Sequence, residues 1–144
     1  MTDPWYGKTM GQTEITDFLT EQATGVLALS NDRRAYGIPM SFAWDGDGER
    51  AIMDFGFAET SKKREFIETT DEFCLTVYEW EDPTTWRSVV ITGPLTRLAE
   101  EDVDEDIKAW YYDVAKDIDV SSGIVELEWY ELQADELSGV ALYE

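Results

Sequence analysis

The segment Tyr36–Phe42 reads YGIPMSF and decides how the fold is interpreted, because it is a strand-like run that contains a proline. Proline has no backbone N–H to donate to a sheet, so such a strand belongs at a sheet edge or at a bulge. Gly37 allows another backbone or a ligand to approach closely. The pattern therefore predicts either an edge strand that offers backbone groups to a ligand or an irregular edge strand without one.

Short hydrophobic runs separated by turn signals surround this segment and predict further strands, while stretches with helical spacing predict short helices. The last strand shifts phase at Tyr130 and Leu132, which predicts a bulge. The order lacks regular βαβ alternation, so we expect a mainly β (α+β) protein, an antiparallel barrel with helices at its ends. The expected strands are 25–30, 35–44, 51–55, 73–80, 86–98 and 124–132, and the expected helices are 13–22, 60–70 and 100–116.

The chain of 144 residues has the length of one domain, so we expect a single domain over 1–144, with 1–11 as a loose N-terminal segment. Hydrophobic residues make up 43% and aromatic residues 13%, which excludes an acidic disordered tail. No apolar run approaches the roughly 20 residues of a membrane span, and the N-terminus lacks the pattern of a signal peptide. We expect a cytoplasmic protein in which the single cysteine, Cys74, is an inert core thiol.

The charge of the chain is strongly negative, at −21, and its acidic residues are spread along the whole sequence. Concentrated salt screens the self-repulsion of such a surface, so the composition predicts a halophilic protein. A protein that is acidic without being halophilic, and an acidic decoy that mimics nucleic acid, are the alternatives. Direct nucleic-acid binding is not expected, because no stripe of basic residues could neutralise phosphates.

Histidine is absent from the chain, which excludes catalytic triads that use histidine, zinc sites that need imidazole and haem held by histidine. No pair of carboxylates is singled out by spacing, so catalytic residues are not assigned. The acidic run 100–106 lacks the spacing of a calcium loop and is interpreted as a solvated helix start, so no metal site is expected.

Three consecutive basic residues, Lys62, Lys63 and Arg64, follow Thr60 and Ser61 at a predicted helix start. A helix N-terminus with hydroxyl and ammonium groups is a plausible site for a phosphate monoester. The alternative is a solvated helix face in which these residues pair with nearby carboxylates.

Trp86, Arg87 and Ser88 begin the strand that follows the turn 81–85. An aromatic ring, a guanidinium and a hydroxyl at one strand start could stack on a ligand and bind an anion. Ordinary packing of Trp86 and a surface ion pair for Arg87 are the alternative interpretation.

Taken together and in this order, these motifs resemble those of the pyridoxamine 5′-phosphate oxidase-like flavin-binding proteins, in particular small haloarchaeal members. The resemblance covers about residues 12–98, and 124–143 is similar to the closing strand of the family. It implies a six-stranded antiparallel split β-barrel with short flanking helices, assembled as a homodimer with FMN at the subunit interface. It does not extend to the histidine and basic residues with which the true oxidases hold pyridoxal phosphate.

The resemblance also implies a set of cofactor-binding residues from three segments. The Ser-x-Lys segment is the one that holds the FMN phosphate in the family, the proline-containing strand runs beside the flavin ring, and the later strand approaches the cofactor region. On this sequence these residues are Ser61, Lys62 and Lys63; Ile38, Pro39, Met40 and Ser41; and Trp86 and Ser88.

The function that follows is an FMN-binding oxidoreductase-like protein whose partners are a second copy of itself and a small-molecule substrate, with no nucleic acid and no membrane. A deazaflavin-dependent reductase is the closest enzymatic alternative. The other alternative is a non-catalytic module that stores flavin or senses redox state. Oxidation of pyridoxamine phosphate itself is not expected.

Overall fold

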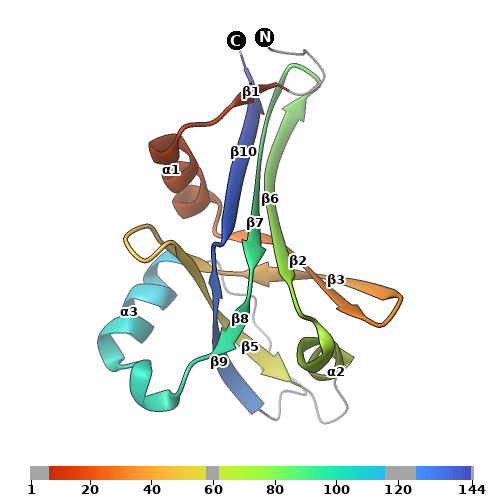
Figure 1. Ribbon diagram of the computed structural model, residues 1–144. Coiled ribbons are helices and arrows are strands. Elements are labelled where there is room, and N and C mark those ends of the chain that lie inside the picture. Colours follow the sequence, from red (N-terminus) through yellow and green to blue (C-terminus); the bar gives the residue numbers. More distant parts are fainter. Residues whose placement is uncertain (1–6, 58–61, 116–125, 144) are drawn as a thin grey trace.

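The computed structural model describes residues 7–57, 62–115 and 126–143 (Figure 1). Its strands form one sheet of six strands and one of four, and every strand pairing is antiparallel. Three α-helices complete this part of the chain. The mainly β class and the antiparallel sheets predicted from the sequence are confirmed. The strand pairings form two sheets, and the six-stranded barrel stays a prediction.

The six-stranded sheet carries the proline-containing strand at its edge. Among the described strands, this strand, β3, pairs only with β2, and Pro39 lies opposite Val26. The predicted edge position is confirmed, because no other strand of the sheet needs the hydrogen bond that proline lacks. In spatial order the strands are β1 (Lys8–Thr9), β10 (Glu136–Leu142), β7 (Thr85–Gly93), β6 (Phe73–Asp82), β2 (Thr24–Asn31) and β3 (Arg34–Ser41).

The four-stranded sheet shows that two expected strands each divide between the sheets. The segment 35–44 forms β3 and then a strand of the other sheet, and 86–98 divides in the same way after β7. The stretch 124–143, which resembles one closing strand, contains two strands, and the second of them, β10, lies in the six-stranded sheet. The order of the four-stranded sheet is β4 (Ala43–Asp45), β5 (Arg50–Phe57), β9 (Glu126–Gln133) and β8 (Leu95–Arg97).

A glycine forms the corner where the chain changes sheets twice. Gln133 N donates to Pro94 O at 3.2 Å and Asp135 N donates to Thr92 O at 3.0 Å, so β7–β8 and β9–β10 cross here in direct contact. A Cβ on Gly93 would lie 1.8 Å from the backbone oxygen of Gln133. Only glycine therefore fits this crossing.

The strand β9 is continuous, and the bulge predicted from its phase shift is wrong. It pairs with β5 without a break from Arg50–Gln133 to Phe57–Glu126. Tyr130 packs in the main core, while Trp129 packs under a helix on the opposite face. Apolar residues on both faces of β9 thus reflect two covered faces rather than a slip in register.

The helices cover the sheets at different places. Helix α1 (Gln12–Gln22) buries Phe18 and Leu19 in the main core, α2 (Lys62–Thr69) packs against β2, and α3 (Glu105–Val114) covers a second core around Tyr111 and Trp129. The helix expected over 100–116 is interrupted: a 3₁₀ turn (Glu100–Asp102) precedes α3. Asp104 then caps α3 by accepting a 2.9 Å hydrogen bond from Ile107 N.

The expected loose segment does not extend over residues 7–11. Lys8 and Thr9 pair with β10, Met10 is buried, and Met10 N donates to Gly139 O at 2.8 Å. Residues 1–6 lie outside the described part of the chain. No helix in the described part is long and apolar enough to cross a bilayer.

Candidate functional site

Within residues 7–57, 62–115 and 126–143, no helix or strand covers the side of the six-stranded sheet turned away from the main core (Figure 1). Strand alternation places every second residue on this side, and the pairing register aligns them in rows, as in Tyr78–Ser88–Val140. We call this side the outer face. Its residues include Val26, Ala28, Gly37, Pro39, Cys74, Thr76, Tyr78, Trp80, Trp86, Ser88, Val90, Thr92, Glu136, Ser138, Val140 and Leu142.

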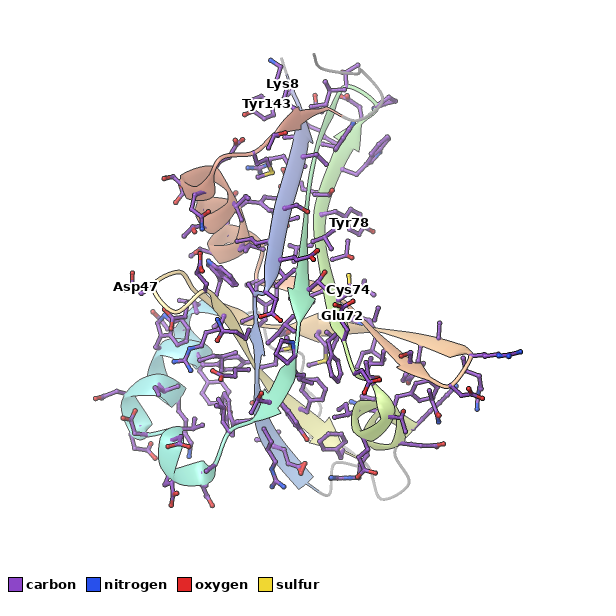
Figure 2. The ribbon with its side chains drawn as sticks, viewed as in Figure 1. Lys8, Asp47, Glu72, Cys74, Tyr78 and Tyr143 are labelled. Atoms are coloured by element: carbon purple, nitrogen blue, oxygen red, sulfur yellow. The ribbon has the colours of Figure 1, made fainter. Side chains whose placement is uncertain are left out.

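The outer face is mostly apolar or neutral, and it is open. Tyr78 is 62% exposed, Trp80 60% and Val26 40%, and Figure 2 shows Tyr78 and Cys74 along the same side of β6. Glu136, which lies opposite Thr92 at one end of this face, is the one charged residue among those named, although charged residues make up 30% of the chain. An exposed surface with so few charged residues in such an acidic protein marks a surface that another molecule covers.

The N-terminal turn of α2 presents one exposed ammonium group. The Nζ atom of Lys62 lies 4.7 Å from the ring centroid of Tyr36 and 5.7 Å from that of Phe66. Lys62 forms no salt bridge with a carboxylate of residues 7–57, 62–115 or 126–143. Its charge is therefore available to an anion at this end of β3.

Lys63 is turned inward. Its Nζ atom donates a 2.8 Å hydrogen bond to Gly56 O in β5 and lies 6.0 Å from the ring centroid of Phe57. Burial lowers the pKa of Lys63, because desolvation penalises the charged amine. The side chain retains further N–H donors but is less exposed than Lys62.

Arg64 has a structural partner. Its Nη1 atom lies 3.2 Å from both carboxylate oxygens of Glu128, which also forms an ion pair with Arg97 Nη1 at 3.3 Å. Its guanidinium carbon lies 4.2 Å from the ring centroid of Phe57. Because the Glu128 side chain is only 3% exposed, this carboxylate needs both arginines to offset its desolvation. The basic run thus divides into one exposed cation, one half-buried amine and one structural arginine.

The predicted residues of β3 differ in what they could present to a ligand. Pro39 is exposed on the outer face, whereas Ile38, Met40 and Ser41 are buried, at 7%, 9% and 7% exposure. Ile38 and Met40 belong to the main core. These three could meet a ligand mainly through backbone atoms at the free edge of β3, as the sequence interpretation supposed.

Trp86 and Ser88 lie on the outer face but far from β3. Strands β2 and β6 lie between β3 and β7. Because neighbouring strands are about 4.8 Å apart, the distance from β3 to β7 is roughly 14 Å. Within one chain, the β3–α2 group and the β7 group are therefore separate. Ser61, the remaining predicted residue, lies outside the described part of the chain.

Sequence reasoning missed several residues of this surface. Cys74 is half-buried on the outer face, with its Sγ atom 4.0 Å from Thr76 Oγ1, so its placement in the core was wrong. Tyr78 and Trp80 fall within the expected strand 73–80 but were not assigned to a surface. The available signal was that this strand carries apolar residues on both faces, because a strand covered on one side alternates with polar residues. Among residues 7–57, 62–115 and 126–143, no group of three cysteine or acidic residues could hold a metal ion.

Comparison with known proteins gives a family match across nearly the whole chain. The sequence profile of a family described as pyridoxamine 5′-phosphate oxidase matches residues 11–141. No curated protein matches the chain.

Solved structures with the same fold include proteins named for flavin. A FAD-binding protein from Mesorhizobium loti is 20% identical, with a TM-score of 0.74 over 95% of this chain and 97% of that one. The FAD-binding protein from Mycobacterium smegmatis is 15% identical, with a TM-score of 0.66 over 96% and 100%. A FAD- and haem-binding protein from the same organism is 13% identical, with a TM-score of 0.69 over 93% and 72%. At these identities the likeness is one of fold.

Proposed function

The chain belongs to the pyridoxamine 5′-phosphate oxidase family, and on that premise we propose that it is an FMN-dependent oxidoreductase that works as a homodimer. The carrying observation is the mostly uncharged outer face, which ends at the free edge of β3, together with the exposed ammonium group of Lys62, which lies over Tyr36 on the other side of that strand. A flavin has a flat apolar ring system and a phosphate, so this surface fits it. Bound FMN supplies the redox chemistry, while the protein orients it and adjusts its electrostatics.

The phosphate end of the cofactor is assigned to the start of α2. Lys62 offers an exposed ammonium group, Lys63 contributes donors from a more buried position, and Ser61 completes the motif. Arg64 is not assigned to the phosphate, because it already serves the buried carboxylate of Glu128. A terminal monophosphate suits this compact basic site, which favours FMN over FAD. The FAD-binding neighbours make FAD the direct alternative, beside deazaflavin.

A second copy of the chain would complete the site. One chain keeps Trp86 and Ser88 apart from β3 and α2, but two outer faces packed about a two-fold axis could bring these groups to one cofactor. Covering the exposed rings of Tyr78 and Trp80 would stabilise such a dimer through burial of apolar surface. The dimer and the cofactor site are thus parts of one proposal.

The salt environment and location follow from composition. We assign the protein to a salt-rich cytoplasm because of its net charge of −21. In about 1 M salt the screening length falls to about 3 Å, which removes most of the repulsion. Its free energy of unfolding should therefore rise with potassium chloride concentration, as measured by urea titration. A constant or falling value would contradict the halophilic assignment.

The first test is the visible absorption spectrum of the protein purified in concentrated potassium chloride, before and after unfolding. Flavin bands are expected, and the mass of the released compound distinguishes FMN from FAD and deazaflavin. A colourless protein that takes up none of the three contradicts the proposal. A loaded protein that no nicotinamide donor reduces would instead favour the non-catalytic storage or sensing role.

The second test compares the FMN affinity of the variants Lys62→Gln and Lys63→Gln, with Lys8→Gln as the matched control. Lys8 is exposed in β1, at the end of the six-stranded sheet opposite α2 (Figure 2). Loss of a charge-assisted hydrogen bond of about 1.5–3 kcal/mol should weaken FMN binding by tenfold or more in Lys62→Gln. Equal affinity of the parent and both α2 variants, measured by fluorescence titration, would remove the phosphate from this site.

A further inference from the structure

A pocket lies on the side of the molecule opposite α2. The turn between β4 and β5 projects between α1 and α3 (Figure 1), and Figure 2 shows Asp47 at its tip, away from Cys74 and Tyr78. The pocket between these elements has a volume of about 560 Å³. The residues that line it include Trp44 and Trp110, Ile52 and Ile107, and the acidic Asp47 and Asp106.

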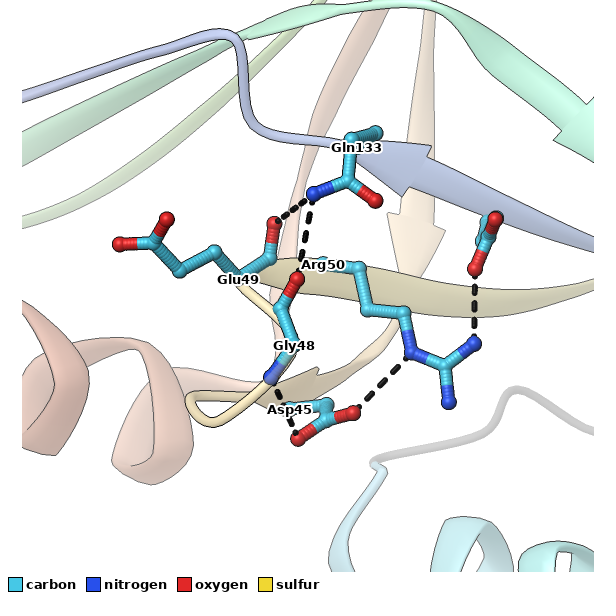
Figure 3. Close-up of polar contacts among 6 residues, drawn as sticks. Asp45, Gly48, Glu49, Arg50 and Gln133 are labelled. Atoms are coloured by element: carbon cyan, nitrogen blue, oxygen red, sulfur yellow. Dashed lines mark hydrogen bonds and ion pairs between the residues drawn. The ribbon is translucent and has the colours of Figure 1, made fainter.

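The turn that forms one wall is held in place by side chains (Figure 3). Asp45 accepts hydrogen bonds from Gly48 N at 3.2 Å and Arg50 Nε at 3.0 Å. Arg50 Nη1 also binds Glu131 at 2.7 Å, and Gln133 Nε2 donates to Gly48 O at 3.1 Å. The pocket wall is therefore fixed before any ligand arrives, which lowers the entropic cost of binding.

The carboxylates around the pocket leave an uncompensated negative charge. The one basic lining residue, Arg50, is already paired with Asp45 and Glu131. Asp47 and Asp106 form no salt bridge with a basic side chain in the described part of the chain. Asp104 adds a third carboxylate while capping α3. The pocket thus attracts a cation, and its two indoles favour an organic one.

A buried donor at the pocket lacks a partner. Trp44 is only 5% exposed, and its Nε1–H makes no hydrogen bond within the described residues. This nitrogen lies at the Thr16–Gly46 end of the pocket, where a Cβ on Gly46 would be 3.6 Å from Trp44 Nε1 and 3.2 Å from Thr16 Cγ2. An unsatisfied buried donor is costly, so an acceptor atom on a ligand would relieve it.

We propose that this pocket binds a small organic cation that carries a hydrogen-bond acceptor, with an amino alcohol as the simplest chemistry. The cationic end lies against the indole of Trp110 and near Asp47 and Asp106, and its hydroxyl oxygen accepts from Trp44 Nε1. Ile52 and Ile107 contact the carbon atoms between them. The site is separate from the flavin surface and does not depend on the proposed function.

The probe is choline, and its control is 3,3-dimethylbutan-1-ol, which has the same shape and hydroxyl group without the charge. Binding is followed on the full-length protein in moderate salt by calorimetry and by the ¹⁵N-edited indole resonance of Trp44, which Trp44→Phe assigns. Choline should shift this resonance saturably and bind at least about fivefold more tightly than the neutral alcohol. Equal affinities, or no saturable shift with choline, overturn the proposal.

A pair of matched variants tests the carboxylates. Asp47→Asn with Asp106→Asn should weaken choline binding about five- to tenfold, because both charges lie at the pocket. Asp17→Asn with Asp113→Asn changes the net charge equally at exposed sites that do not line the pocket, and should retain the parental affinity. Equal losses in the two double variants would show general charge attraction and overturn the assignment.

Discussion

The two faces of β6 and β7 differ completely, although they are built from alternate residues of the same strands. On the inner face, Leu75, Val77 and Ile91 are fully buried, at 0% exposure. On the outer face, Tyr78 is 62% exposed, and its neighbour Ser88 faces the same side. Residues one position apart thus serve different purposes: the inner set stabilises each chain, whereas the outer set is available for a partner or a ligand.

The largest expected effect is a loss of stability when a glycine at the strand crossing is replaced, compared with a glycine on the outer face. Gly93→Ala would place a methyl group against the backbone of Gln133, so we expect a loss of more than about 4 kcal/mol in the free energy of unfolding. On the outer face, a Cβ on Gly37 would meet only Val26 Cγ1, at 3.5 Å, so Gly37→Ala should fold normally. Urea titration of both variants is the measurement, and a stable Gly93→Ala protein would contradict the crossing geometry.

A smaller loss of stability is expected when neighbouring positions on the two faces are truncated to alanine. Leu75→Ala leaves a cavity in the core and should destabilise the protein by about 3 kcal/mol. Thr76→Ala, one residue later on the outer face, should cost less than about 1 kcal/mol. Chemical denaturation of the cofactor-free protein at low concentration measures both, so that association does not contribute. Similar costs would mean that the outer face is also packed within one chain.

The next prediction leaves the chain folded and tests association. Ser88→Arg puts a large charged group at the centre of the outer face, and it should abolish dimerisation and lower flavin content about tenfold or more. Arginine reduces the net negative charge, so increased repulsion cannot explain the loss. Thr13→Arg on exposed α1 is the matched control. Sedimentation velocity and the visible spectrum would contradict the proposed dimer if both variants behave as the parent.

The smallest effect concerns a phenol in the core. Burial, followed by the nearby Glu128 charge, raises the pKa of Tyr130 above 10.0. Above pH 10 the unfolded phenol loses its proton while the folded one keeps it, so this contribution to stability is lost as pH rises toward the folded pKa. Tyr130→Phe should therefore show a shallower fall in unfolding free energy between about pH 9.5 and 11. Identical slopes for both proteins would show that Tyr130 does not contribute.

Local features of the fold could be predicted because their causes are local. Pro39 lacks an N–H, which is enough to send its strand to a sheet edge. Helical spacing predicted α1 almost to its ends, and the exclusion of histidine chemistry needed only composition. The candidate site was predicted as three segments, and the structure assigns a different environment to each residue of the basic run.

The rest depended on contacts between residues distant in sequence. The division of 86–98 between two sheets depends on the close contact of Gly93 with the backbone of Gln133. Arg64 is held by Glu128 of the distant strand β9, whereas Lys62 of the same helix stays exposed. Neither partner is visible from local spacing.

By itself, the sequence determined the strand and helix types, the edge strand, the extreme charge and the chemistry that the chain lacks. Only the tertiary structure decided which face of β6 and β7 is covered, which cation is exposed and that Trp44 and Trp110 share a pocket. The physical reason is that alternation specifies which residues share a face, whereas the choice of the face to be buried depends on the elements that pack against it.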